Sequence, residues 1–113
     1  GISVMGHVGL LPQTANKFGI LGKNGKEADN ILDEALKIAS AGAFSIVLES
    51  ISEELARIIT DKVDIPTIGI GAGRNCDGQV LVLYDLLGLY PDFEPKFARK
   101  YLNYFFHFTF HKI

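Results

Sequence analysis

Apolar and polar positions follow a helical period in the first half of the chain. Within residues 26–41, acidic, amide and lysine side chains occupy the positions between the apolar ones, and this spacing predicts an amphipathic helix. Asn24, with Glu27 three residues later, predicts the N-terminal cap, and Gly42 predicts the left-handed residue that ends the helix. The apolar positions are Ala28, Ile31, Leu32, Ala35 and Ala39.

A second helix is predicted over residues 52–62. Ser52 can accept a hydrogen bond from an amide of the first turn, and Glu53 and Glu54 place negative charge where the helix dipole favours it. The apolar positions Leu55, Ile58 and Ile59 again recur at helical spacing.

Short apolar runs rich in β-branched residues lie around these helices. Residues 43–48 and 67–70 are the clear cases, and residues 2–8 and 79–83 are weaker ones. Such runs suit strands that are covered on both faces of a parallel sheet. The alternation of strands and helices predicts an α/β fold, either a layered sheet or a barrel.

Composition and charge narrow the function classes. The 113 residues are 48% apolar and 21% charged, with a net charge of −2, which is a globular composition. No apolar run reaches the length of a membrane span and no secretory leader is evident, so we expect a soluble, cytoplasmic protein without a membrane partner. The near-neutral charge argues against a nucleic-acid partner, and the single Cys76 excludes an internal disulfide.

The last 13 residues, 101–113, break the pattern because they hold half of the chain's aromatic residues and no acidic residue. An exposed segment of this kind promotes association. His107 and His111 lie one helical turn apart within it, but no third ligand accompanies them. We therefore predict no metal site there, and the isolated Asp77 and Asp85 do not predict one either.

Glu49 is the candidate catalytic residue. It ends an apolar strand and precedes a helix start, which places it at the carboxyl edge of the sheet, where α/β folds bind their ligands. A glutamate that merely begins a solvated loop is the alternative.

His7 is the second candidate. It lies between Gly6 and Gly9, which leave room for a ligand or for close approach of another backbone. An imidazole there could donate a hydrogen bond to a substrate oxygen or relay a proton. A histidine held by backbone groups within the sheet is the alternative. The glycines of residues 69–73 lack the spacing of a dinucleotide-binding loop.

Four ordered segments resemble the ketopantoate hydroxymethyltransferase family. They are VMGHVGLLPQ at residues 4–13, GAFSIVLE at 42–49, IPTIGIGAG at 65–73 and CDGQVLVLYDLLG at 76–88. The resemblance implies a (β/α)8 TIM-type barrel, of which residues 1–100 form the second half, strands five to eight. Residues 101–113 depart from the family pattern, as does GILGKNG at residues 19–25.

The resemblance also implies an activity. The family transfers a hydroxymethyl group from 5,10-methylenetetrahydrofolate to 3-methyl-2-oxobutanoate, giving 2-dehydropantoate for pantothenate synthesis, with Mg²⁺ stabilising the enolate. Glu49 matches the glutamate that takes the proton from substrate C3, and His7 matches a histidine at the substrate. The family's metal ligands and active-site lysine belong to the first four strands and have no counterpart here, so the chain is expected to need a metal-binding N-terminal half.

Two alternatives accompany this interpretation. The chain could be an inactive relic or partial copy of that enzyme, or, from another class, a small flavodoxin-like binding domain. The second needs about five parallel strands around a switch point, and only four strand signals are visible. A homo-oligomer is expected from the family resemblance.

Overall fold

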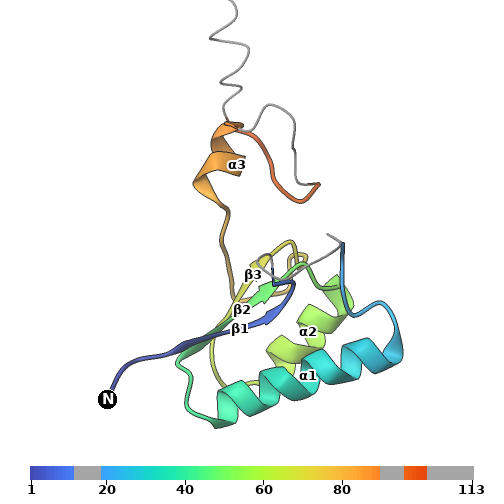
Figure 1. Ribbon diagram of the computed structural model, residues 1–113, viewed down its shortest axis with the longest axis vertical. Helices are drawn as coiled ribbons and strands as arrows, with labels where there is room; N and C mark the ends of the chain where they lie inside the picture. The colour runs from blue at the N-terminus through green and yellow to red at the C-terminus, as the bar shows by residue number, and fades with distance from the viewer. Residues whose placement is uncertain (12–18, 90–95, 102–113) are drawn as a thin grey trace, which may run out of the picture. The chain divides into compact units, whose positions relative to one another are not determined.

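The computed structural model describes residues 1–11, 19–89 and 96–101 (Figure 1). The elements in chain order are β1 (Met5–Gly9), α1 (Gly25–Ser40), β2 (Ser45–Glu49), α2 (Glu53–Lys62), β3 (Thr67–Ile70), β4 (Gly78–Gln79) and α3 (Leu83–Leu87). The chain forms two compact units, Gly1–Val80 and a second unit that begins at Leu81.

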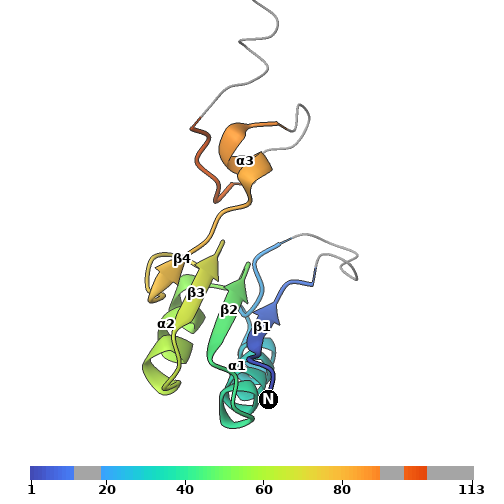
Figure 2. The same cartoon turned by 90° about the vertical axis from the view of Figure 1, so that its left-hand side faces the viewer.

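The four strands form one parallel sheet in the order β1-β2-β3-β4 (Figure 2). The predicted α/β fold with a parallel sheet is therefore confirmed. In the part of the chain that is described, the strand order never reverses. A flavodoxin-like ligand site requires such a reversal, and a segment of a barrel does not.

The two sides of the sheet differ because successive side chains of a strand point to opposite faces. Helices α1 and α2 both lie against the same side (Figure 2). The residues of the sheet on this side, called the helix face, include Gly6, Val8, Ile46, Leu48, Thr67 and Gly69. The alternate residues of the same strands, called the site face, include Met5, His7, Val47, Glu49 and Ile68.

The hydrophobic core lies between the helix face and the two helices. Ile46 and Leu48 are 0% exposed, and they pack with Ile31 and Ala35 of α1 and with Ile59 of α2. An alanine at Gly6 would place its Cβ 2.2 Å from Ile38 of α1, so glycine lets this helix approach β1.

Helix α1 begins and ends as the sequence predicts. Asn24 Oδ1 accepts a hydrogen bond from Glu27 N–H at 2.9 Å, and Gly42 has a φ of 96°. The Glu27 carboxylate accepts from Gly22 N–H at 2.7 Å rather than completing the reciprocal bond of a capping box. This contact fixes the chain just before the helix.

Helix α2 is also capped as predicted. Ser52 Oγ accepts from Leu55 N–H at 3.4 Å. The same hydroxyl donates to the Gly22 carbonyl at 3.2 Å, so the start of α2 is tied to the segment that precedes α1.

The strand boundaries differ from the predicted ones most in β1 and β4, whereas β2 (Ser45–Glu49) differs by one or two residues from the predicted 43–48. Strand β1 begins at Met5, not at residue 2, and Ile2 is 93% exposed. Strand β4 contains only Gly78 and Gln79, whereas residues 79–83 were expected as the strand. The apolar run from residue 80 has no decisive period. Helix α3 begins within it at Leu83 and is followed by the C-cap Gly88, which has a φ of 63°.

The second unit is described only in part. Within it, Tyr101 N–H donates to the Leu86 carbonyl at 2.8 Å, and the Arg99 guanidinium lies 5.3 Å from the centroid of the Tyr101 ring. Apart from Tyr101, the expected aromatic tail lies outside the described residues. None of the helices in the described ranges is long and apolar enough to span a membrane.

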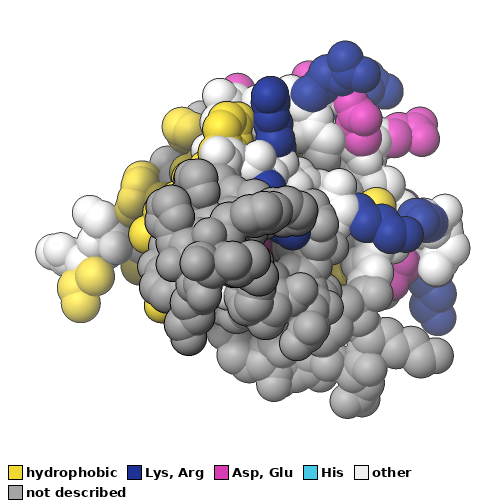
Figure 3. Space-filling model, turned by 90° about the horizontal axis from the view of Figure 1, so that it is seen from above, with side chains coloured by type: hydrophobic (Ala, Val, Ile, Leu, Met, Phe, Trp, Pro, Cys, Tyr) yellow, Lys and Arg dark blue, Asp and Glu magenta, His cyan; other side chains and the backbone are white. Residues whose placement is uncertain are grey.

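Surface charges of opposite sign lie close together, as the space-filling view shows (Figure 3). Lys37 pairs with Asp33 within α1, and Arg57 pairs with Asp61 within α2 at 3.8 Å. Exposed pairs of this kind contribute little to stability.

Candidate active site

The structure brings the two predicted site residues together on the site face. Gly9 is the register partner of Glu49, and His7 is the partner of Val47, so His7 and Glu49 are diagonal neighbours on adjacent strands. His7 Nε2 lies 2.9 Å from Glu49 Oε2, and the two side chains are 30% and 22% exposed. This pair forms a partly buried imidazole–carboxylate site at the carboxyl end of β2.

The chemistry of the two groups assigns roles within this hydrogen bond. An ionised carboxylate only accepts, so whenever Glu49 is ionised, His7 Nε2 is the donor and Glu49 Oε2 the acceptor. In a neutral imidazole, Nδ1 is then an acceptor. Among the described residues, the hydrogen bond of the Glu49 carboxylate is the one to His7, and it is made through Oε2.

The backbone that carries Glu49 is fixed from three sides. The Glu49 carbonyl accepts from Leu10 N–H at 2.9 Å, and Ser50 N–H donates to the Ile70 carbonyl at 2.8 Å. The Ser50 carbonyl in turn accepts from Leu21 N–H at 2.8 Å. Strand β1, strand β3 and the segment before α1 therefore all hold the turn that presents the carboxylate.

Ser50 has a φ of 52°, which is the left-handed region that residues other than glycine rarely adopt. Strain of this kind persists only where the surrounding contacts over-determine the backbone, and it is common at active sites. The hydrogen bonds on both sides of Ser50 supply that constraint.

The glycines beside His7 leave room for protein packing. Gly9 has a φ of 104°, and a Cβ at this position would lie 2.1 Å from the Glu49 carbonyl oxygen. Of the two predicted reasons for these glycines, close approach of another backbone is therefore the one that applies to Gly9. Gly6 instead leaves space for a side chain of α1.

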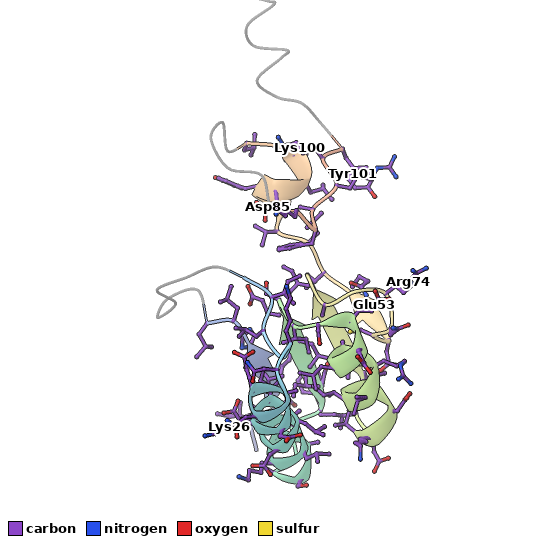
Figure 4. The ribbon with its side chains drawn as sticks, turned by 90° about the vertical axis from the view of Figure 1, so that its right-hand side faces the viewer. Lys26, Glu53, Arg74, Asp85, Lys100 and Tyr101 are labelled. Atoms are coloured by element: carbon purple, nitrogen blue, oxygen red, sulfur yellow. The ribbon has the colours of Figure 1, made fainter. Side chains whose placement is uncertain are left out.

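The glycine-rich segment after β3 forms a loop that is tied to the start of α2. Arg74, beside Glu53 in Figure 4, donates from Nε to Glu53 Oε1 at 3.2 Å. Asn75 Nδ2 donates to the same oxygen at 3.3 Å. Gly73 has a φ of 78°, and a Cβ there would collide with the Glu53 side chain. Gln79 Nε2 donates to the Gly73 carbonyl at 3.0 Å.

Asp77 has a structural role that the sequence did not suggest. Its Oδ2 accepts from Thr67 N–H at 2.8 Å and from the Thr67 hydroxyl at 3.1 Å, while Asp77 N–H donates to that hydroxyl at 3.2 Å. Thr60 Oγ1 lies 2.9 Å from Thr67 Oγ1 and links this network to α2. Thr67 and Asp77 are ten residues apart. The only sign of their contact in the sequence is a polar side chain at the start of β3 and another after its end.

A metal site within residues 1–11, 19–89 and 96–101 would need a group of ligating side chains. No group of three or more histidine, cysteine, aspartate or glutamate side chains in these ranges could hold an ion. The described part of the chain therefore does not fit the metal that the resemblance implies. His107 and His111 lie outside the described residues.

Comparison with known proteins matches the chain to one family. The family described as ketopantoate hydroxymethyltransferase matches residues 1–109. Among curated proteins, the 3-methyl-2-oxobutanoate hydroxymethyltransferase of Clostridium kluyveri is 57% identical over 105 residues, which cover 90% of this chain and 38% of that protein. The proteins of the same name from Pseudothermotoga lettingae and Thermotoga maritima are 56% and 57% identical and cover 93% and 91% of this chain.

The chain spans only part of the length of these relatives. It covers 38% of the Clostridium kluyveri protein, 41% of the Pseudothermotoga lettingae protein and 39% of the Thermotoga maritima protein. Both Glu49 and His7 lie within the matched residues.

Proposed function

Because this chain belongs to the ketopantoate hydroxymethyltransferase family, we propose that it takes part in the transfer of a hydroxymethyl group from 5,10-methylenetetrahydrofolate to 3-methyl-2-oxobutanoate. The product is 2-dehydropantoate, a precursor of pantothenate. The observation that carries the proposal is the hydrogen-bonded pair of Glu49 and His7 at the carboxyl end of β2.

Glu49 acts as the base in this proposal. The proton on C3 of a 2-oxo acid is acidic because the adjacent carbonyl delocalises the electrons of the broken C–H bond into an enolate. The enolate carbon then forms a bond to the one-carbon unit. A partly buried carboxylate at a sheet edge can take such a proton. His7 lies beside the substrate, next to this carboxylate.

We further propose that β1 to β4 are strands five to eight of a (β/α)8 barrel. Residues 1–100 then form the second half of the barrel, with the site face turned to its interior, and residues 101–113 lie outside it. The Mg²⁺ ligands and the active-site lysine would come from the first four strands, on the same polypeptide or on a separate N-terminal half. The assembled enzyme would be a homo-oligomer.

The test is the exchange of the C3 proton of 3-methyl-2-oxobutanoate for deuterium in D₂O, together with folate-dependent formation of 2-dehydropantoate, both by the complete enzyme. Glu49→Gln keeps the size of the side chain and removes the base. It should lower both rates at least about 100-fold, because a positioned base contributes roughly 10²–10⁴-fold.

Glu54→Gln is the matched control, since this exposed glutamate lies in the first turn of α2 away from the pair. It should leave both rates unchanged. Activity that survives Glu49→Gln would remove this residue from the mechanism. A folded wild-type enzyme with neither reaction would favour the inactive relic.

A further inference from the structure

We propose that His7 is a positioning residue that acts through Glu49: its Nε2–H holds Oε2 of the carboxylate so that Oε1 faces the C3 proton of the substrate. This inference rests on the proposed function and specifies how its base is aligned. The resemblance alone places a histidine at the substrate and does not say which group the imidazole contacts.

The geometry supports an action on Glu49. The backbones of both residues are held by the ladder between β1 and β2, and the Glu49 carbonyl is fixed by Leu10 N–H at 2.9 Å. The glutamate side chain itself has three rotatable bonds, so a fixed backbone does not determine where its carboxylate points. The hydrogen bond from His7 at 2.9 Å is the contact among the described residues that selects one carboxylate orientation.

The donor inventory of imidazole supports the same role. In its neutral form the ring has one N–H, and with an ionised Glu49 that hydrogen belongs on Nε2, the ring nitrogen 2.9 Å from Glu49 Oε2. Nδ1 is then an acceptor, so a neutral His7 cannot also donate to the oxo or carboxylate oxygens of a 2-oxo acid. Those oxygens must find their donors elsewhere in the enzyme, and the contribution of His7 to the reaction passes through the carboxylate.

Glu49 alone takes up and returns the transferred proton, and His7 keeps its hydrogen throughout. Oε1 takes the C3 proton, and the C–H electron pair becomes the enolate. Water adds to the one-carbon unit as its two C–N bonds to the folate break, and the two protons of the water go to the folate nitrogens. The unit is then at the oxidation level of formaldehyde, so the new C–C bond to the enolate needs no oxidant or reductant. The hydroxymethyl oxygen then takes the proton from Oε1, which restores the carboxylate while Oε2 stays bonded to His7.

Two variants of the complete enzyme separate positioning from substrate binding. His7→Leu removes the donor, and His7→Gln retains an amide N–H at a position similar to that of Nε2. For C3 exchange, we expect His7→Leu to lower kcat about 100-fold, while the KM of the 2-oxo acid changes less than about threefold. We expect the kcat of His7→Gln to be at least about tenfold higher than that of His7→Leu. A raised KM with unchanged kcat, or no recovery by glutamine, would overturn the proposal.

A double-mutant cycle tests whether the effect passes through the carboxylate. The variant His7→Leu/Glu49→Gln should exchange no more slowly than Glu49→Gln alone, because the histidine has no base left to align. Additive losses would show that His7 acts independently. If His7→Leu fails to fold, His7→Asn takes its place, since its shorter amide retains polarity and does not reach Oε2.

A third measurement does not depend on activity. Nitrogen NMR should find the His7 ring with hydrogen on Nε2 in the wild-type protein, and the Nε2 signal should move in Glu49→Gln and not in Glu54→Gln. A neutral ring with hydrogen on Nδ1 would overturn the proposal even in an enzyme without turnover. By contrast, the proposed function fails when the correct tautomer is present and C3 exchange is absent.

Discussion

The helix face and the site face are made by alternate residues of the same strands, yet they follow different rules. On the helix face, Val8, Ile46 and Leu48 are at most 3% exposed and pack against two helices. On the site face, His7 and Glu49 keep 30% and 22% of their side chains exposed and bond to each other. The comparison shows that one set of positions stabilises the fold while the set between them carries the polar chemistry.

Substitutions at two adjacent residues of β2 test the difference between the two faces most directly. Leu48→Ala should lower the free energy of unfolding by roughly 2–5 kcal/mol, because it leaves a cavity between the sheet and the helices. Val47→Ala, on the site face, should cost about 1 kcal/mol or less, since this side chain is only half-buried. Urea unfolding of both variants measures the difference, and equal losses would mean that the two faces are equally packed.

Gly9→Ala tests how the sheet backbone supports the site. The added Cβ would lie 2.1 Å from the Glu49 carbonyl oxygen at a φ of 104°. We expect a loss of about 1–3 kcal/mol in stability from backbone strain, with slower C3 exchange because the Glu49 turn must shift. Gly25→Ala is the control, since no atom lies within 4 Å of its Cβ. A stable, fully active Gly9→Ala variant would contradict the close approach.

Asn24→Ala perturbs the helix layer alone. It removes the side chain that accepts from Glu27 N–H at 2.9 Å, and the loss of such a cap costs about 1 kcal/mol. Thermal unfolding should register this loss while the kcat for C3 exchange stays the same. Asn24→Asp retains an acceptor and should restore most of the stability. A fall in kcat would show that the two faces are coupled.

The smallest expected effect concerns the thiol of Cys76, whose titration depends on burial at the helix face. Burial raises the pKa of its thiol, which lies against Gly69 and packs with the core. The folded protein should therefore hold this thiol protonated to a higher pH than the unfolded chain does. The corresponding stabilisation is present below the unfolded pKa and is lost as the pH rises through the folded pKa.

Iodoacetamide alkylation over a pH series, with and without urea, measures both states of this thiol. The midpoint should lie at higher pH in the folded protein. Coincident midpoints would place Cys76 in solvent.

Local features of the sequence predicted the elements that depend on local physics. Helix α1 follows from its apolar spacing, the Asn24 cap and Gly42, and each of these features has its expected place. The strand predicted at residues 79–83 exists as β4, but its bounds were wrong because a short apolar run does not distinguish a strand from the start of a helix.

The sequence allowed the residues of the candidate site to be predicted, but not their contact with each other. The position of Glu49 at a strand end was readable from the sequence, as were the glycines around His7. Their hydrogen bond was not, because His7 and Glu49 are 42 positions apart and their contact depends on the register of β1 against β2. Helical periodicity and caps contain no information about that register.

The alternation of the two faces along β2 constrains which length changes the gene can tolerate. Deleting the codon for Ser45, Ile46 or Val47 would move every later side chain of the strand to the opposite face, so Leu48 would turn to the site face, Ser50 would take the place of the carboxylate and the charge of Glu49 would enter the core. The equivalent deletion in an exposed loop leaves this parity intact. Natural variants of this protein should therefore vary in length between the strands and keep the strand itself at five residues.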